Sequence, residues 1–325
     1  MQLAQLLAKS SDATVRLVQL SAKHLEPYLE MVSNPEARRL TATTQSFTRE
    51  QIQDWLSTRA ETPNRRDWAI IDASGEFVGE VVLNEFNDSK NEMNLRIALR
   101  GPKYYNLGYG RQAIALALVH AFDDLFLDRV TISALVDNRR AQASYESVGF
   151  VAGRQYNDKG LRFQRMSVNK WQFVYALGEA GLKKYLNSFT RRWQFDFDNG
   201  KRRAGLCNYT DRKITISKYL VGIHSVDESL QVLAHEIAHA LCGPNEGHGK
   251  VWKATAKQLG YRHEKFSGNE IAKEKAPWVG HCPKGHEHYR YRRPTRVLSC
   301  AICSRSYSDA HRIVWQKVTE LKGNY

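Results

Sequence analysis

The stretch HEIAHALCGPNEGHGKVW, residues 235–252, decides how the second half of this chain is interpreted. His235 and His239 are four residues apart, so on a helix both imidazoles project from one face and can reach the same ion. Glu236 then lies near the open position, where it can take a proton from a zinc-bound water whose pKa is lowered to about 7. The pattern predicts a zinc helix, and two helix histidines placed by chance are the alternative.

Flanking residues predict where this helix begins and ends. Ser225 followed three residues later by Glu228 is a capping box, and Gly243 with Pro244 stops the helix. An apolar stripe runs between these ends: Leu230, Leu233, Ile237 and Leu241. Upstream, turn-forming pairs at 199–200 and 210–211 between alternating runs predict hairpins.

The third ligand distinguishes the classes of zinc peptidase. The metzincin pattern needs Gly and His three and six residues after the second histidine, where this chain has Cys242 and Asn245. A class with a glutamate ligand would need Glu264 or Glu270, outside the predicted helix pair. His248 is better placed, because it follows a short loop and opens HGKVWKATAKQLGY, a predicted second helix.

HExxH followed by His-Gly-x-x-Trp, at His248, Gly249 and Trp252, resembles the SprT-like metallopeptidases, the family that includes the Spartan DNA–protein crosslink proteases. Residues 204–217 are similar to that family's substrate-side hairpin, and the resemblance spans about residues 188–310. It implies a protein substrate held near DNA, with a zinc site and a general base made by four residues: His235, His239, His248 and Glu236.

A second metal site is predicted in CPKGHEHYRYRRPTRVLSCAIC, residues 282–303. Three of the chain's five cysteines lie there, too few for a disulfide framework: Cys282, Cys300 and Cys303. His286 is the best candidate for a fourth ligand, with His281 and His288 as competitors, and Cys₃His is a usual set for structural zinc. A metal-free tail is the alternative.

Net charge separates the two halves. Residues 1–170 carry 22 Lys and Arg against 20 Asp and Glu, a net +2, whereas residues 171–325 carry 26 against 14, a net +12. An excess confined to one half favours a polyanionic partner for that half. The segment YRYRRPTR interleaves two tyrosines with four arginines suited to phosphate contacts and base stacking: Arg290, Arg292, Arg293 and Arg296. A solvated basic loop is the alternative.

In the first half, stretches that predict strands alternate with stretches that predict helices, as in a mixed α/β domain. The predicted strands are residues 15–20, 67–73, 77–86, 94–100 and 129–136, with a last strand inside 159–176. The predicted helices are residues 48–60, 108–125 and 139–150, and a helix at 177–187 is expected to begin the second half.

Two motifs in this half suggest a cofactor. In YYNLGYGRQAI, residues 104–114, Gly108 and Gly110 let the backbone approach a ligand, and the first helix amides are free donors suited to a pyrophosphate. A tight strand–helix turn is the alternative. The second motif, DNRRAQASYESVGF, spans residues 137–150.

The two motifs together resemble the GNAT N-acetyltransferase family, and within it most closely the branch that acetylates ribosomal-protein N-termini. Tyr105–Gly110 occupies the frame of the acetyl-CoA loop, although Tyr105 replaces the usual Arg or Gln and leaves one phosphate contact in doubt. The second family pattern is complete: Asn138, Ala141, Tyr145, Gly149 and Phe150. The resemblance covers about residues 13–168.

The resemblance implies that acetyl-CoA is the cofactor and that amides of five residues hold its pyrophosphate: Leu107, Gly108, Tyr109, Gly110 and Arg111. It also implies that the strand from Ile97 to Leu99 pairs with the pantetheine arm, that Asn138 faces the cofactor, and that Tyr145 protonates the departing thiolate. No general base is identified. Three glutamates lie on suitable strands, with surface carboxylates as the alternative: Glu80, Glu85 and Glu92.

The sequence therefore predicts an α+β chain in four segments. These are a GNAT-like mixed α/β sheet at 1–170, a linker helix at 171–187, a small α+β SprT-like metallopeptidase domain at 188–278 and a zinc-ribbon-like segment at 279–325. No run reaches the ~18 apolar residues of a membrane span, and no basic start precedes a long apolar core. The expected compartment is the cytoplasm, with no membrane partner.

The predicted function is bifunctional: an acetyl-CoA-dependent N-acetyltransferase fused to a zinc metallopeptidase that cleaves nucleic-acid-bound proteins, as in DNA repair. One catalytic and one structural zinc are expected, with DNA and a protein substrate as partners. In the alternative, the acetyltransferase acts on a protein, nucleic acid or small molecule, and the zinc half only binds nucleic acid through a closed metal site.

Overall fold

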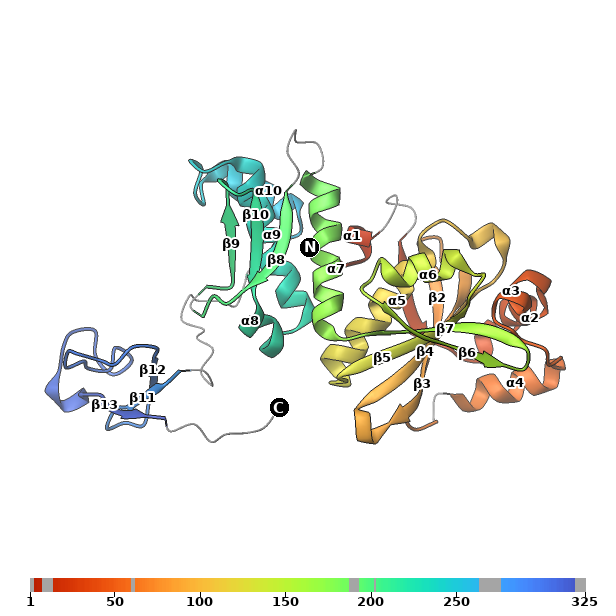
Figure 1. Ribbon diagram of the computed structural model, residues 1–325, viewed down its shortest axis with the longest axis horizontal. Helices are drawn as coiled ribbons and strands as arrows, with labels where there is room; N and C mark the ends of the chain where they lie inside the picture. The colour runs from red at the N-terminus through yellow and green to blue at the C-terminus, as the bar shows by residue number, and fades with distance from the viewer. Residues whose placement is uncertain are drawn as a thin grey trace. The chain divides into compact units, whose positions relative to one another are not determined.

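The computed structural model describes residues 3–7, 14–59, 62–186, 193–201, 203–262 and 276–318. The chain forms two compact units, one made of Met1–Asp198 with Gly205–Glu264 and the other of Asn199–Ala204 with Lys265–Tyr325 (Figure 1). The larger unit combines helices with a seven-stranded and a three-stranded sheet, and the smaller unit has a three-stranded sheet, so the predicted α+β class is confirmed. No helix of the described residues is long and apolar enough to span a bilayer.

The larger unit opens with α1 (Leu3–Leu7) and contains a seven-stranded sheet in the order β1-β2-β3-β4-β5-β7-β6. Its strands are β1 (Val15–Gln19), β2 (Arg66–Asp72), β3 (Phe77–Asn87), β4 (Glu92–Leu99), β5 (Arg129–Leu135), β6 (Val151–Asp158) and β7 (Leu161–Val168). The mixed sheet predicted for this half is confirmed. Strand β6 was not predicted, because all eight of its residues are exposed and it shows no apolar alternation.

Strands β4 and β5 run parallel but pair over a short stretch. The paired residues are Glu92–Asn94 on β4 and Arg129–Thr131 on β5. Beyond them β4 continues to Leu99, where its described partner is β3 alone. The sheet therefore opens between β4 and β5 toward their carboxyl ends.

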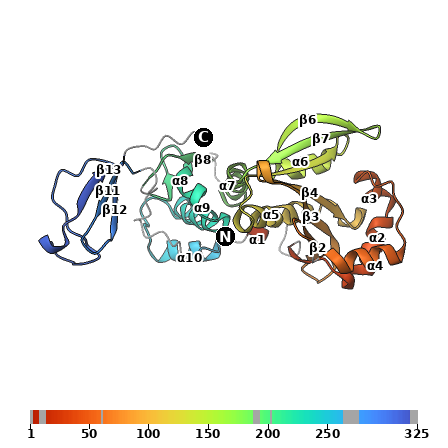
Figure 2. The same cartoon turned by 90° about the horizontal axis from the view of Figure 1, so that it is seen from below.

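Helices cover both faces of this sheet. Helices α2 (Leu25–Ser33), α3 (Pro35–Leu40) and α4 (Arg49–Thr58) lie between β1 and β2 in the chain, and α5 (Tyr109–Val119) and α6 (Arg139–Glu146) follow β4 and β5. Ala98 packs into the core under α2 and α4, whereas its neighbours Ile97 and Leu99 face Gly110 of α5. Because side chains alternate along a strand, α4 and α5 lie on opposite faces (Figure 2).

Short turns complete this half: 3₁₀ turns at Ala22–His24, Asp88–Lys90 and Pro102–Tyr104, and a π-helical turn at His120–Asp124. Helix α7 (Lys170–Leu186) starts seven residues before the helix expected at 177–187 and one residue before the segment 171–187 assigned to a linker helix. Asn169 and Gln172 explain the early start, since each side-chain oxygen accepts the other's backbone N–H at 2.9 Å.

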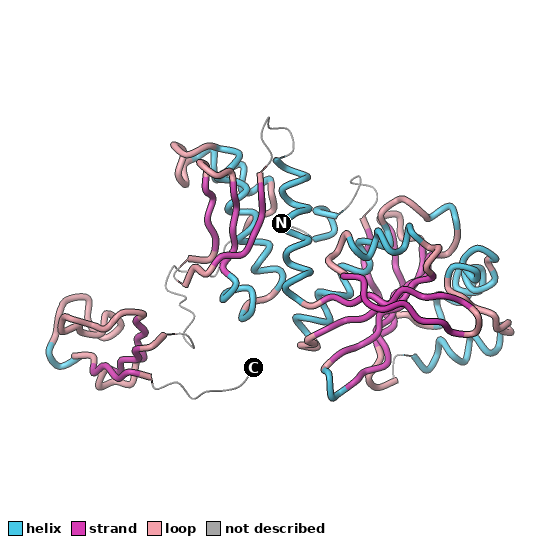
Figure 3. Tube along the Cα trace, in the orientation of Figure 1, coloured by secondary structure: helices cyan, strands magenta, loops and turns pink. Residues whose placement is uncertain are grey.

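In the described residues up to 262, α7 is followed by a three-stranded sheet and three α-helices, which can be followed in Figure 3 by their magenta and cyan colours. The strands β8 (Gln194–Asp198), β9 (Gly205–Asn208) and β10 (Lys213–Ser217) are arranged β8-β10-β9, followed by α8 (Lys218–Ile223), α9 (Val226–Cys242) and α10 (Lys250–Gln258). Helix α9 begins with the predicted capping box of Ser225 and Glu228 and ends at Gly243.

The hairpin predictions are half right. The turn at 210–211 joins β9 and β10 as an antiparallel pair, but the turn at 199–200 makes no hairpin, because β8 pairs with β10 in parallel. Strand β10 takes the central place because Ile214–Ser217 are all buried, whereas the flanking strands are partly exposed.

Asp123, in the π-helical turn, ties the first half to the start of α9. Its Oδ2 accepts the N–H of Val226 at 2.7 Å, and its Oδ1 lies 3.0 Å from Nζ of Lys170. A carboxylate is favourable at a helix N-terminus. Farther along α9, a Cβ built on Gly181 of α7 would lie 3.1 Å from Leu233, so the two helices pack closely.

The smaller unit has a sheet in the order β12-β11-β13, formed by β11 (Trp278–His281), β12 (Glu287–Arg290) and β13 (Val314–Lys317), with a 3₁₀ turn at Asp309–His311. Its apolar core is small and centres on Cys282, Cys300 and Ile313. A core of this size leaves room for a metal to contribute to folding.

Candidate active sites and metal centres

The three histidines of the predicted zinc set meet at one point. His235 and His239 project from α9, and His248 comes from the turn before α10. Their Nε2 atoms lie 3.1 Å from one another. Nitrogens at this spacing suit one zinc at about 2.0–2.1 Å from each, and three protein ligands are typical of a catalytic site. Glu264 and Glu270 lie outside the described residues.

Trp252 of α10 supports this cluster. It is 5% exposed, and its ring centre lies 4.8, 5.3 and 4.5 Å from those of His235, His239 and His248. Tyr261, not singled out from the sequence, stands 5.6 Å from His235. These rings restrict rotation of the imidazoles, which explains physically why a tryptophan accompanies the third histidine.

Glu236 lies against the edge strand β9. The side chain is buried, and a Cβ built on Gly205 would lie 2.7 Å from its Oε1 and 2.8 Å from Cγ1 of Val232. Position 205 therefore has no room for a side chain. Sequence patterns did not single out Gly205, because the contact joins residues about thirty positions apart.

Two further residues of the β9–β10 hairpin, Cys207 and Tyr209, lie beside the histidine cluster and Glu236. Burial and then the charge of Glu236 raise the pKa of Cys207 to about 12, so this thiol stays protonated. The hydroxyl of Tyr209 donates to the carbonyl oxygen of His239 at 2.8 Å, which fixes the hairpin to α9.

The smaller unit brings together the predicted Cys₃His set. Nδ1 of His286 lies 3.5, 3.5 and 3.2 Å from Sγ of Cys282, Cys300 and Cys303. The sulfurs of Cys282 and Cys303 are 3.8 Å apart, close to the spacing that ~2.3 Å bonds to one tetrahedral zinc require. The cluster contains neither competitor, His281 nor His288. Burial opposes ionisation of Cys282, but backbone N–H groups outweigh it and lower its pKa to about 6.

The four arginines proposed to contact nucleic acid lie at and after the end of β12 and are all exposed: Arg290, Arg292, Arg293 and Arg296. Arg293 lies 6.0 Å from the Trp278 ring centre, and Lys201 lies 4.7 Å from that of Tyr291. This loop and the neighbouring segments with Lys201 and Trp278 thus place cations beside aromatic faces, an arrangement suited to a single-stranded nucleic acid.

The predicted cofactor loop lies over the open part of β4. Gly108, with φ +90°, precedes α5, and a Cβ on Gly110 would lie 3.8 and 3.9 Å from Ile97 and Leu99. Leu107 is exposed and Tyr109 is buried. The amides at the start of α5 and the free length of β4 are therefore neighbours, as a cofactor bound to both would require.

Three other residues of the cofactor prediction have additional structural roles. Asn138 caps α6 by accepting the N–H of Ala141 at 3.1 Å. Tyr145 is buried, 6.0 Å from Phe150 by ring centres, and burial raises its pKa, so the phenol keeps its proton. The guanidinium of Arg111 donates to the carbonyl oxygen of Leu7, and burial lowers its pKa.

Two of the three candidate glutamates are not surface carboxylates. The hydroxyl of Tyr28 donates to Glu80 at 3.1 Å, and burial raises the pKa of Glu80. Glu92 is 6% exposed, whereas Glu85 is exposed. The alternative that these glutamates are surface carboxylates is therefore wrong for Glu80 and Glu92.

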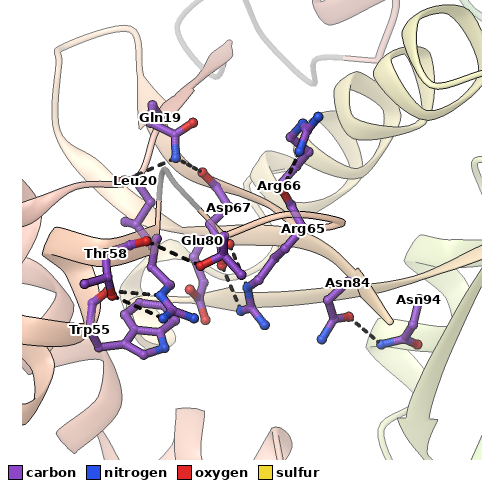
Figure 4. Close-up of polar contacts among 12 residues, drawn as sticks. Gln19, Leu20, Trp55, Thr58, Arg65, Arg66, Asp67, Glu80, Asn84 and Asn94 are labelled. Carbon is purple, nitrogen blue, oxygen red and sulfur yellow. Dashed lines mark hydrogen bonds and ion pairs between the residues drawn. The ribbon is translucent and has the colours of Figure 1, made fainter. Parts of the chain in front are cut away.

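Other polar pairs surround Glu80 on this face of the sheet (Figure 4). Arg65 binds Asp67 through two bonds of 2.7 and 2.8 Å, and the Asn94 amide donates to Asn84 at 3.1 Å across β3 and β4. The sheet face that packs under α2 and α4 therefore carries polar side chains on β3 and β4. The opposite face, under α5, is apolar at Ile97 and Leu99.

Two known family models match separate parts of the chain. Residues 14–151 match the model of the acetyltransferase (GNAT) domain, and residues 176–273 match that of the SprT-like family. The chain therefore carries a GNAT domain followed by a SprT-like domain.

Individual relatives match the first half. An FsC-acetyl coenzyme A-N(2)-transacetylase of Aspergillus fumigatus is 27% identical over 150 residues, which are 42% of this chain and 62% of that relative's length. A Vibrio cholerae spermidine N-acetyltransferase in complex with CoA and spermine aligns with a TM-score of 0.46 at 20% identity, over 51% of this chain and 99% of that one. A chimera of that enzyme with hSSAT gives 0.43 at 20% identity, over 49% and 98%.

Proposed function

We propose that this chain, with its GNAT and SprT-like domains, is a bifunctional enzyme. One half transfers acetyl groups from acetyl-CoA to an amine, and the other is a zinc peptidase that cleaves proteins held on DNA, a function in DNA repair. The observation that carries the peptidase proposal is the triangle of imidazole nitrogens 3.1 Å apart, with the buried Glu236 on the same helix.

In the acetyltransferase half, amides at the start of α5 would bind the pyrophosphate, and β4 beyond Asn94 would pair with the pantetheine arm. The neutral amine nitrogen attacks the thioester carbonyl carbon and releases one proton to solvent, the C–S bond breaks, and the sulfur takes a proton. Tyr145 can supply that proton, since burial keeps its phenol protonated.

In the peptidase half, His235, His239 and His248 would hold the zinc. A zinc ion bound there would supply a Lewis acid for the scissile carbonyl and would lower the pKa of a bound water molecule. Glu236 accepts the proton and returns it to the departing amine. The exposed edge of β9, beside Glu236, can bind an extended substrate as an added strand.

DNA association is supported by the charge of the second half. Residues 171–325 carry a net +12, and four exposed arginines share the loop after β12. Neutralising phosphates releases counterions, so such a loop favours nucleic acid over neutral partners.

The alternative, a zinc half that only binds nucleic acid, requires a closed metal site. Among the described residues three ligands converge at α9, and a fourth protein ligand is not among them. Three histidines with a glutamate on the same helix match the ligand number of catalytic zinc sites, which supports hydrolysis over a closed site.

The experiment is cleavage of a protein crosslinked to single-stranded DNA by the full chain. We expect cleavage that stops when zinc is removed with a chelator, returns when zinc is added back, and is lost in Glu236→Gln with the zinc content unchanged. Equal cleavage by wild type and variant would show that the peptidase proposal is wrong.

A further inference from the structure

A polar cavity of about 610 Å³ lies beside the point where β4 and β5 separate. Its walls include Asn94 and Thr131, the last pair that joins the two strands. A cofactor arm lying in the opening would end near this pair. The cavity is large enough for a small-molecule ligand.

The wall formed by β3 contains an irregularity. The β3–β4 register shifts between Asn84 and Asn87, and Glu85 within that shift has φ +55°. This backbone region is unfavourable for a non-glycine residue, and bulges of this kind redirect side chains. Here the bulge places Glu85 on the cavity wall.

Glu92 is the buried acid of the cavity. It is 6% exposed, and its ion-pair partner among the described residues is Arg165, at 3.7 Å, longer than a hydrogen bond. A carboxylate removed from water needs a compensating donor. An ammonium group in the cavity would supply one.

The charges of the walls are unbalanced. Three carboxylates line the cavity, on Glu85, Asp88 and Glu92, against one guanidinium, on Arg165. The remaining polar walls come from neutral side chains such as Asn94 and Thr131. The surroundings therefore favour a ligand with more than one positive charge.

We propose that this cavity is the acceptor site of the acetyltransferase half and that it takes small amines with a second cationic group, such as alkyl diamines. The inference rests on the proposed acetyl transfer. One ammonium group, once deprotonated, is the nucleophile, and the other stays charged against the carboxylates.

The test compares three acceptors of equal reach with the full chain and acetyl-CoA: 1,4-diaminobutane, butylamine and 4-aminobutyrate. We expect kcat/KM to be at least about fivefold higher for the diamine than for butylamine, as for a partly exposed ion pair, and lowest for the amino acid. Glu85→Gln and Asp88→Asn should raise KM several-fold more for the diamine than for butylamine, because only the diamine has a second cation to lose its partner. Glu146→Gln, an exposed carboxylate on α6 outside the cavity, is the matched control.

The outcomes separate the two proposals. Failure to bind CoA in calorimetry, with no acetylation of any amine, would overturn the acetyltransferase proposal itself. Binding of CoA with equal use of butylamine and diamine, with no effect of either variant, or with none of the three amines acetylated, would overturn the cationic acceptor alone. Glu85 and Asp88 are exposed, so their variants should fold as the wild type does.

Discussion

The guanidinium carbon of Arg140 lies 4.0 Å from the ring centre of Tyr105. The resemblance to acetyl-CoA loops predicts Arg or Gln at position 105, and the Tyr105 found there carries no charge for a phosphate. Arg140, the second residue of α6, brings a cation to the same loop and rests on the aromatic face. We therefore expect Arg140 to supply the missing contact.

Arg140→Ala should raise KM for acetyl-CoA about tenfold with little change in kcat, because the cofactor loses a charge-assisted bond to phosphate while the reacting groups are untouched. Steady-state kinetics at saturating acceptor measures this. Arg139→Ala, the exposed neighbour on the same helix, should leave KM unchanged. Equal effects of the two substitutions would count against a specific role for Arg140.

Gly205→Ala should displace Glu236 and so impair the peptidase site, although Gly205 is not one of the histidines that would bind zinc. The added carbon would lie 2.7 Å from the Glu236 carboxylate, so β9 or the carboxylate must move, with a cost of roughly 1–3 kcal/mol. We expect a lower unfolding temperature and at least a tenfold loss of peptidase rate, with acetyl transfer retained. Gly153→Ala on β6 is the control, because its nearest atom is 3.4 Å away. Full peptidase activity in Gly205→Ala would contradict the packing argument.

Local patterns explain what the sequence could predict. The capping box of Ser225 and Glu228 and the four-residue spacing of His235 and His239 are set within one helix, so periodicity and end signals suffice to place them. His248 follows because a short loop limits how far it can lie from the first two ligands.

Contacts between distant segments could not be predicted. The pairing of β8 with β10 rather than β9, the contact of Gly205 with Glu236, and the bond from Val226 to Asp123 depend on which strand or helix is most completely buried. Strand β6 gave no pattern because neither of its faces is covered.

His286→Ala should remove one zinc from the chain and unfold the smaller unit, since a core of Cys282, Cys300 and Ile313 is small and binding free energy at such a site is folding free energy. Metal analysis and thermal denaturation measure both effects. His281→Ala, an exposed histidine outside the cluster, should bind as much zinc as the wild type. If His286→Ala kept its full zinc content, another residue would be the fourth ligand.

Tyr145→Phe should lower kcat for acetyl transfer by about a hundredfold, because the sulfur loses its proton donor while the ring still fills its site. Burial raises the pKa of Tyr145 above its usual value near 10. The stability gained from burying the neutral phenol is therefore present below pH ~10 and decreases above it. Wild-type kcat should show no fall from this group below that pH. A kcat for Tyr145→Phe equal to that of Tyr185→Phe, on α7, would exclude the acid role.

Replacing Arg290, Arg292 and Arg293 together with Ala should weaken DNA binding and flatten its dependence on salt. Each phosphate that is no longer neutralised reduces the slope of log affinity against log salt by about 0.7–0.9, so the slope of the triple variant should fall by about 2–3. The matching Lys replacements keep the charge and should keep most of the slope, but they lose affinity if stacking by the guanidinium planes contributes. If the salt dependence of the Ala variant equalled that of the wild type, the DNA contacts would lie elsewhere in residues 171–325, which carry the net charge of +12.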